Sequence, residues 1–271
     1  MIDRYAVFGH PIAHSKSPEI HENFARQTGQ ALSYEAIFVP LDGLIDSIAQ
    51  FRAEGGRGAN ITVPFKEQAH RLCGQRTPRA DWAGAVNTLM FKDDVILGDN
   101  TDGAGLVTDL THNHKVVLVG KRILLLGAGG AARGVIGPLL ECSPTSLVIA
   151  NRTASRAHDL VAHFQQRGTH ALSGCSLDEV REPFDLIINA TAASLSGELP
   201  LVSSRIFQPA SLAYDMMYGR SLTPFLEWAQ RQGARTTDGL GMLVEQAAEA
   251  FYLWRGVRPV THSVIAALRA A

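Results

Sequence analysis

The clearest chemistry in the sequence lies in a glycine-rich turn that follows the apolar run at residues 122–126. Gly127, Gly129 and Ala132 have the G-x-G-x-x-A spacing of a dinucleotide-binding loop. The first glycine permits a tight turn, the second lets the backbone approach a pyrophosphate, and the alanine lets a helix pack closely on the strand. The start of that helix offers free N–H groups to the phosphates. The turn therefore predicts that the protein binds a dinucleotide.

The residues after the second strand of this unit favour one cofactor. An NAD site usually has an acid there, which binds the ribose hydroxyls and would repel a 2′-phosphate. This chain has Asn151, Arg152 and Thr153 at that point, and Arg156 follows one helical turn later. Arginine suits a 2′-phosphate, although both arginines could also be ordinary solvated residues at a helix start. We predict NADP(H).

Lys66 is the best local candidate for moving a proton, which oxidation of an alcohol by NADP⁺ requires. It follows an expected strand and opens an expected helix, where the helix dipole favours the neutral form of a lysine. A lysine at a helix start is most often a surface residue, however, and Asp102 could equally be a turn or cap aspartate. Local sequence leaves both roles open.

The segment around Ser17 and Pro18 has two compatible interpretations. Serine followed by proline is a common helix start, with serine at the N-cap and proline at the first position. Such a helix end, with the hydroxyl of Ser15 beside it, can also hold a substrate carboxylate.

Composition indicates an ordinary globular protein. Hydrophobic residues make up 46% of the 271 residues and charged residues 19%, which suits a sizeable core. The formal net charge of -1 gives no reason to expect nucleic acid or an anionic membrane as partner. The N-terminus lacks a signal pattern, and the apolar stretch at about 123–140 is too interrupted to span a bilayer, so we expect a cytoplasmic protein.

Neither a metal site nor a disulfide framework is predicted. Cys73, Cys142 and Cys175 are odd in number and far apart, which favours free thiols. The histidines are scattered, and His112 and His114 are interpreted as part of a polar loop.

Strand-like and helix-like segments alternate along the chain, which predicts α/β sheets with parallel pairs. The first series has expected strands at 5–9, 34–39, 59–63, 85–91 and 95–98, the last two forming a hairpin, and expected helices at 18–28 and 44–53. A mixed helical stretch at about 103–119 bridges to a second series, with strands at 123–126, 147–150, 186–189 and 212–216. Helical stretches separate the first three of these strands. A last helix is expected at about 243–254.

Short motifs in order along the whole chain resemble those of the shikimate dehydrogenase family. They occupy residues 11–18, 60–66, 84–88, 99–103, 127–132, 151–153, 214–218 and 238–248. The chain looks like the biosynthetic, NADP-dependent type. The resemblance implies reversible reduction of 3-dehydroshikimate to shikimate by NADPH, on the route to chorismate and the aromatic amino acids.

The resemblance also implies a fold of two α/β domains. A substrate-binding domain, residues 1–103, would be completed by about 240–271, and a Rossmann-type NADP-binding domain would span 104–239. The C-terminal helix would pack back on the first domain, and the substrate would lie in a cleft between the two.

Site roles follow from the matching positions. Lys66 would be the acid/base residue and Asp102 its partner, while Ser15 and Ser17 would hold the substrate carboxylate. The ring and its hydroxyls would be bordered by Thr62, Asn87, Tyr218 and Gln246. The pyrophosphate would lie on Gly127, Ala128, Gly129, Gly130 and Ala131. The adenosine phosphate would lie on Asn151, Arg152, Thr153 and Arg156, and the nicotinamide near Met216 and Gly239.

Two positions depart from the family pattern. Many relatives carry serine after the position of Thr191, whereas Ala192 and Ala193 follow here, which puts a hydroxyl contact with the cofactor in doubt. Pro78 stands where many relatives carry an acid, so one polar contact near the cleft is lost while the catalytic pair is kept.

Two alternatives remain. The chain could be a quinate/shikimate dehydrogenase of broader specificity, although relatives that prefer NAD tend to carry an acid where Arg152 stands. It could also be a non-catalytic small-molecule sensor, but a sensor would be free to lose Lys66 or Asp102. The expected partner is a small-molecule substrate, shikimate or 3-dehydroshikimate, and the sequence leaves open whether the protein is a monomer or a homodimer.

Overall fold

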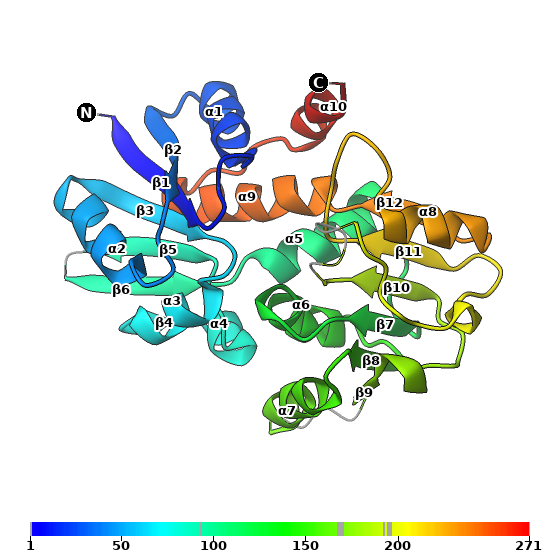
Figure 1. Cartoon of the computed structure of the whole chain (residues 1–271). Helices are drawn as coiled ribbons and strands as arrows, with labels where there is room; N and C mark the ends of the chain where they lie inside the picture. Colours follow the sequence, from blue (N-terminus) through cyan, green and yellow to red (C-terminus); the bar gives the residue numbers. More distant parts are fainter. Residues whose placement is uncertain (1, 93, 167–170, 192, 194–196, 271) are drawn as a thin grey trace. The chain divides into compact units, whose positions relative to one another are not determined.

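The computed structural model describes residues 2–92, 94–166, 171–191, 193 and 197–270. The chain divides into two compact units, of which unit 1 contains Met1–Gly105 and Leu243–Ala271 and unit 2 contains Leu106–Met242. The chain leaves unit 1 within helix α5 (Asp102–Thr108) and returns to it within helix α9 (Leu240–Arg255) (Figure 1). Unit 1 is therefore built from two separate stretches of sequence, whereas unit 2 is one continuous stretch.

In the described part of unit 1, six strands form a mixed sheet in the order β2-β1-β3-β5-β6-β4. The strands are β1 (Asp3–Gly9), β2 (Leu32–Phe38), β3 (Gly56–Ile61), β4 (Gln75–Arg76), β5 (Thr88–Lys92) and β6 (Val95–Asp99). β1 pairs in parallel with β2 and β3, whereas β5 runs antiparallel to β3 and to β6. The other helices of this unit are α1 (Ser17–Thr28), α2 (Leu44–Ala53), α3 (Lys66–Leu72), α4 (Pro78–Ala83) and α10 (His262–Ala270).

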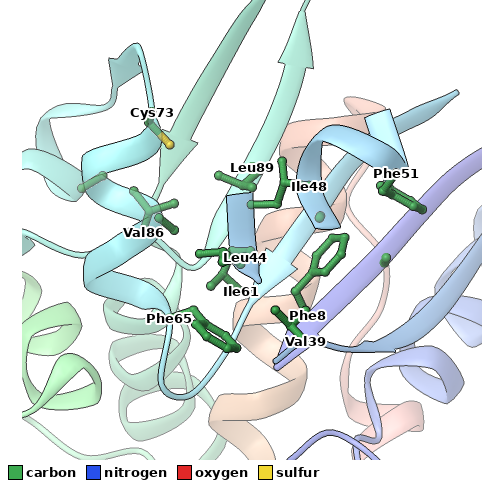
Figure 2. Close-up of a cluster of buried hydrophobic side chains, with 14 residues drawn as sticks. Phe8, Val39, Leu44, Ile48, Phe51, Ile61, Phe65, Cys73, Val86 and Leu89 are labelled. Carbon is green, nitrogen blue, oxygen red and sulfur yellow. The ribbon is translucent and has the colours of Figure 1, made fainter. Parts of the chain in front are cut away.

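One face of this sheet is covered by α2, α3 and α4. The apolar residues of α2 recur at helical spacing, so that Leu44, Ile48 and Phe51 all face the core. Phe51 packs so closely that a Cβ atom at Gly56, which begins β3, would lie 2.3 Å from its ring. Figure 2 shows this cluster, in which Phe8 of β1 also takes part.

The other face is covered by α1 and by the C-terminal helices. Successive side chains of a strand point to opposite faces, so Tyr5 of β1 points away from the cluster that contains Phe8. Its ring stacks on Trp254 of α9 at 4.6 Å. A second buried cluster joins α1, α9 and α10 through Ile20, Phe24, Val244, Ala247, Ala248, Phe251 and Val264. This confirms the prediction that the C-terminal helix packs back on the first part of the chain.

Unit 2 contains a sheet in the order β9-β8-β7-β10-β11-β12, and every pairing between neighbouring strands is parallel. Its strands are β7 (Arg122–Leu126), β8 (Ser146–Asn151), β9 (Leu172–Ser176), β10 (Leu186–Asn189), β11 (Leu212–Asp215) and β12 (Arg235–Asp238). Its main helices are α6 (Gly130–Glu141), α7 (Ala154–Gln165) and α8 (Pro224–Arg231). Numbered within the unit, the order is 3-2-1-4-5-6, which is that of a Rossmann fold. The predicted fold class is confirmed.

Several predicted elements need correction. Six of the described α-helices and strands are not predicted from the sequence, namely β4, β9, β12, α4, α8 and α10. After Leu172, β9 consists of small residues because it lies close against α7, where a Cβ at Gly174 would be 3.0 Å from the carbonyl oxygen of Ala157. β12 is short and polar, as an edge strand can be. The strand predicted at 59–63 is Gly56–Ile61, because Thr62 accepts a hydrogen bond from the backbone of Phe65 and the chain turns there.

Two local predictions about helices are wrong. Ser17 is the first helical residue of α1, and Lys16 occupies the N-cap without a side-chain hydrogen bond. The hydroxyl of Ser15 accepts a hydrogen bond from the backbone N–H of Ser17 at 3.3 Å instead, because it lies just before the helix. The predicted polar loop at His112 belongs to a π-helix of unit 2, Asp109–Asn113, in which Asp109 is buried.

The remaining sequence predictions concern cysteines and the membrane. Cys73 is buried and Cys142 and Cys175 are half-buried, and all three are free thiols. Burial raises the pKa of the Cys73 thiol to about 12. Among the described residues, no helix is long and apolar enough to cross a membrane.

Candidate active site

Lys66 and Asp102 form a largely buried ion pair in unit 1. Lys66 is the first residue of α3, which Phe65 anchors in the core, and Asp102 is the first residue of α5, which follows β6. Their side chains meet at 2.6 Å between Nζ and Oδ2, with exposed fractions of 13% and 6%. The structure therefore brings together two residues whose roles the local sequence left open.

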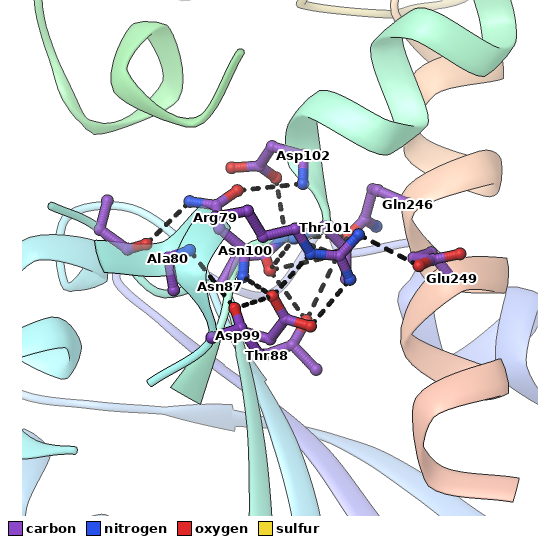
Figure 3. A network of polar contacts seen from close by, with 12 residues as sticks. Arg79, Ala80, Asn87, Thr88, Asp99, Asn100, Thr101, Asp102, Gln246 and Glu249 are labelled. Carbon is purple, nitrogen blue, oxygen red and sulfur yellow. Dashed lines mark hydrogen bonds and ion pairs between the residues drawn. The ribbon is translucent and has the colours of Figure 1, made fainter. Parts of the chain in front are cut away.

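Asn87 holds the second oxygen of Asp102. Its side-chain Nδ2 donates to Asp102 Oδ1 at 2.8 Å and lies 3.3 Å from Oε1 of Gln246, which α9 contributes (Figure 3). Asn87 is itself oriented by its oxygen, which accepts hydrogen bonds from the backbone of Thr101 and from the hydroxyl of Thr88, both at 2.8 Å. With every polar atom of the amide engaged, its orientation is defined.

The loop that carries Asp102 is held by a second set of contacts that sequence reasoning missed. The carboxylate of Asp99 is buried and accepts hydrogen bonds from Thr77 at 2.6 Å and from two nitrogens of Arg79 at 2.7 and 2.8 Å. The side chain of Asn100 accepts from the backbone N–H of Asp102 at 3.1 Å. Asp99 and Asn100 lie in the motif at 99–103, but no feature near Arg79 in the sequence indicates that it reaches this loop.

The two serines lie at the start of α1, and a chain of hydrogen bonds leads from there to Asn87. Ser17 is buried and Ser15 is half-buried. The hydroxyl of Tyr34, which Ser17 contacts, donates to Asn60 Oδ1 at 2.7 Å, and Asn60 Nδ2 donates to the backbone oxygen of Asn87 at 3.2 Å. Burial raises the pKa of Tyr34 well above its usual value, and the Ser17 contact opposes this shift.

Thr62 is half-buried at the end of β3, where its backbone N–H donates to Phe8 at 2.9 Å. Its methyl group fills the space beside Gly9, where a Cβ atom would lie only 2.4 Å away. Tyr218 is half-buried and belongs to unit 2, whereas the other expected substrate residues belong to unit 1. Its place at the substrate stays a prediction.

The predicted cofactor loop in unit 2 has the geometry that a dinucleotide needs. Gly127 has a φ of 109°, which favours glycine, and a Cβ there would lie 3.2 Å from the backbone of Ala190. Gly129 is exposed, and no atom lies within 4 Å of the position that its Cβ would take. Ala132 is fully buried under β7. The loop ends at the N-terminus of α6, so its free N–H groups fit a pyrophosphate above Gly129.

The end of β8 presents positive charge without an acid. Asn151 donates through Nδ2 to the backbone oxygen of Thr153 at 2.9 Å, which shapes the turn into α7. Arg152 and Arg156 are both exposed, and neither forms an ion pair with any residue that the structure describes. Two arginines in this position fit the 2′-phosphate of NADP(H).

Met216 and Gly239 lie together at the ends of β11 and β12. A Cβ at Gly239 would be 2.2 Å from the carbonyl oxygen of Met216, so the contact requires glycine. The backbone N–H of Met216 donates to Asn189 at 2.9 Å, which ties this segment to the end of β10. The two residues thus share one place at the carboxyl edge of the sheet, where Rossmann folds bind their ligands. Ala192, at the first departure from the family pattern, lies outside the described residues.

The parallel sheet, the glycine turn and the buried lysine–aspartate pair define a dinucleotide-dependent dehydrogenase of two units. Family models match the chain as "Shikimate dehydrogenase substrate binding domain" over residues 7–89 and as "Shikimate / quinate 5-dehydrogenase" over residues 109–206. The "Shikimate 5'-dehydrogenase C-terminal domain" matches residues 239–269. The chain belongs to the shikimate dehydrogenase family, as the motifs predict.

Full-length relatives agree with this assignment. The shikimate dehydrogenase (NADP(+)) of Nitrosospira multiformis is 60% identical over 100% of this chain and 98% of its own length. The enzyme of the same name from Dechloromonas aromatica is 61% identical, also over 100% of this chain and 98% of its own length. Among solved structures, shikimate 5-dehydrogenase from Thermus thermophilus, in complex with NADP(H) and shikimate, is 34% identical with a TM-score of 0.88 and covers 99% of both chains.

Proposed function

We propose that this protein is an NADP-dependent shikimate dehydrogenase, which reversibly reduces 3-dehydroshikimate to shikimate in the synthesis of chorismate and the aromatic amino acids. The curated relatives support this activity and cofactor over the whole chain. The observation that carries the proposal is the buried pair of Lys66 and Asp102 at 2.6 Å, with Asn87 holding the second aspartate oxygen.

Reduction of the C3 carbonyl requires a proton at its oxygen, and the reverse reaction requires that proton to leave. The Nζ atom of Lys66 is the proton donor and acceptor at this oxygen. Asp102 holds the ammonium group in place and balances its charge. The short hydrogen bond of 2.6 Å between the two groups fixes the position of Nζ.

The other polar side chains of unit 1 bind and orient the substrate. The hydroxyls of Ser15 and Ser17 at the start of α1 hold the carboxylate, because the N-terminal end of a helix favours an anion. Thr62, Asn87 and Gln246 border the ring hydroxyls. A site of this kind rejects analogues that lack a hydroxyl, since its own buried polar groups would then be left without partners.

Unit 2 holds the cofactor in this proposal. The turn at residues 127–131 binds the pyrophosphate, and the end of β8 at residues 151–156 binds the adenosine phosphate. Met216 and Gly239 border the nicotinamide, and Tyr218 contributes to the substrate pocket. Bound NADPH supplies the hydride.

The proposal is tested by following NADP⁺ reduction with shikimate in the wild type and in Lys66→Ala. Loss of the proton-transfer group should lower turnover by about 10²- to 10⁴-fold. Binding of NADP⁺, measured by calorimetry, should not change, because the predicted cofactor residues lie in unit 2. Lys92→Ala, at an exposed position at the end of β5, is the matched control and should keep wild-type turnover. Near-normal turnover in Lys66→Ala would remove this lysine from the mechanism.

The same assay separates the alternatives. Turnover of quinate with NAD that equals or exceeds that of shikimate with NADP would favour a quinate/shikimate dehydrogenase. No turnover of either substrate by the wild type would favour the sensor. A cytoplasmic location and a monomeric or homodimeric state stay predictions.

A further inference from the structure

Arg79 links the loop that carries Asp102, residues 99–102, to helix α9. Its guanidinium donates through Nε and Nη2 to the two oxygens of Asp99, at 2.7 and 2.8 Å, and through Nη1 to Glu249 Oε1 at 3.1 Å (Figure 3). Asp99 ends β6 and Glu249 lies on α9, 150 positions further along the chain by numbering. One planar group with fixed donor geometry therefore spans two elements that have no other ionic link among the described residues.

On the loop side, the contact is buried and made by several hydrogen bonds. Asp99 has an exposed fraction of 1%, and besides Arg79 its carboxylate accepts from Thr77 and from the backbone N–H of Asn100 at 2.7 Å. Asn100 in turn accepts from the backbone N–H of Asp102. The position of Asp102 is thus tied through two intermediate residues to the guanidinium of Arg79.

On the helix side, the contact lies one turn from a proposed substrate residue. Gln246 and Glu249 are three residues apart on α9 and therefore share a face of the helix. Gln246 reaches the same loop, with Oε1 at 3.3 Å from Asn87 Nδ2 and 3.4 Å from Thr101 Oγ1. These contacts are long for hydrogen bonds, so a small shift of α9 would break them.

We propose that Arg79 and Glu249 are positioning residues that set the distance of Gln246 from Asn87 and Asp102, and thereby the affinity for the substrate. This inference rests on the proposed function, in which Gln246 borders the substrate. The guanidinium of Arg79 fixes the separation between the loop after β6 and helix α9, because Asp99 and Glu249 bind to different sides of this one planar group. Neither Arg79 nor Glu249 needs to touch the substrate for this role.

A second partner of Glu249 provides a matched control. Arg258 Nη2 lies 2.8 Å from Glu249 Oε2, but the arginine is 61% exposed and has no contact with Asp99 in the described structure. Because water screens the exposed guanidinium, this pair contributes less than the pair between Glu249 and the more buried Arg79. Loss of Arg258 leaves the link from Glu249 through Arg79 to Asp99 intact.

The experiment measures the Kd of shikimate by calorimetry without cofactor, for Glu249→Ala, Glu249→Gln and Arg258→Ala in the full-length protein. Loss of about one hydrogen bond at Gln246 predicts a Kd raised about three- to tenfold in Glu249→Ala. Glu249→Gln keeps an oxygen that can accept from Arg79 and should recover part of the affinity. Arg258→Ala should bind as the wild type does. The pH profile of kcat should keep its shape in all three variants, because Lys66 and Asp102 are unchanged.

A Gln246→Ala background decides whether the effect runs through Gln246. In that background, Glu249→Ala should weaken binding no further, because contacting residues that act together are not additive. Equal weakening in both backgrounds, or a wild-type Kd in Glu249→Ala, would overturn the inference. Should Glu249→Ala fail to fold in thermal unfolding, Glu249→Gln takes its place in the same comparison. Failure of the wild type to bind shikimate would instead overturn the proposed function.

Discussion

His21 is a fully buried histidine whose surroundings disfavour the charged form of its ring. It lies on α1, one turn after Ser17, and its ring stacks on Tyr34 at 4.1 Å with Phe24 and Trp254 around it. Burial lowers the pKa of His21 from 6.5 to about 3, and the nearby Asn60 side chain opposes this only in part. The neutral ring packs against α1, β2 and α9 and couples the stability of this region to pH.

The sign of this coupling gives a prediction. The unfolded chain protonates His21 below pH 6.5, while the folded chain does so only near pH 3, so stability is complete above 6.5 and falls as the pH falls toward 3. Between pH 7 and pH 5 this one group costs about 2 kcal/mol of unfolding free energy. In His21→Phe, urea unfolding should show a correspondingly smaller loss over that interval. His262→Gln, at an exposed position, should leave the pH dependence unchanged, and an unaltered pH dependence in His21→Phe would rule out this account.

The candidate site shows what residue types alone can and cannot indicate. The position of Lys66 at a helix start is visible in the sequence, and so is the turn of Asp102. Their partnership is not, because the two lie 36 residues apart and meet only when β3, β5 and β6 form one sheet. The local sequence does not indicate any role for Arg79, since an arginine in a short helix such as α4 is usually a surface residue. Its role becomes visible only when its contact with Asp99 is known.

At the scale of elements, the first turn of α9 depends on a glycine. Asp109 of the π-helix is buried and accepts hydrogen bonds from Tyr214 at 2.7 Å and from Asn113 at 2.8 Å. A Cβ atom at Gly241 would lie 1.9 Å from Oδ1 of this aspartate. The helix therefore tolerates a poor helix former in order to pack on a buried carboxylate.

Replacing this glycine tests the packing. Helix propensity alone predicts that Gly241→Ala stabilises the protein by about 1 kcal/mol. The overlap with Asp109 should reverse the sign and destabilise it by about 1–3 kcal/mol, measured as a lower Tm. Gly74→Ala is the matched control, because no atom lies within 4 Å of the added Cβ there. A Tm that rises in Gly241→Ala would show that the π-helix moves away without cost.

The elements that the sequence analysis predicts and those that it misses differ in a physical way. β7 and β10 are buried on both faces, so their continuous apolar runs are visible in the sequence. β12 has no buried residue and is held by its pairing with β11. Pairing with another strand leaves no hydrophobic pattern in the local sequence. Helix α10 is short and fully buries only Val264, while Ile265 and Leu268 are partly buried against the same cluster.

At the scale of the whole molecule, unit 1 needs both ends of the chain. Phe24 of α1 packs edge-on against Phe251 of α9 at 5.7 Å, and Trp254 donates to the backbone of β5 at 3.0 Å. The first 105 residues alone would leave these surfaces exposed. Unit 2, by contrast, is continuous and has its own buried cluster.

Deletion of residues 243–271 should destabilise unit 1 but leave unit 2 folded. Unit 1 should lose the packing of α1 and become sensitive to limited proteolysis, and shikimate binding should be lost with it. Unit 2 should stay folded and still bind NADP⁺, which calorimetry can measure. Deletion of residues 262–271 alone removes only α10 and should leave shikimate binding largely intact. A protease-resistant unit 1 in the larger deletion would contradict this view of its core.

By itself, the sequence determined the features whose residues are neighbours along the chain. These are the glycine turn at residues 127–132, the arginines after β8, the alternation of strands and helices, and the motifs that show the family. The motifs imply that Lys66 and Asp102 act together, but only the tertiary structure decided which atoms of distant side chains meet. It joins Lys66 to Asp102, Asn87 to Gln246, and Arg79 to both Asp99 and Glu249. The physical reason is range, because propensity and periodicity act over a few residues, whereas a catalytic site is assembled by sheet pairing and helix packing between distant segments.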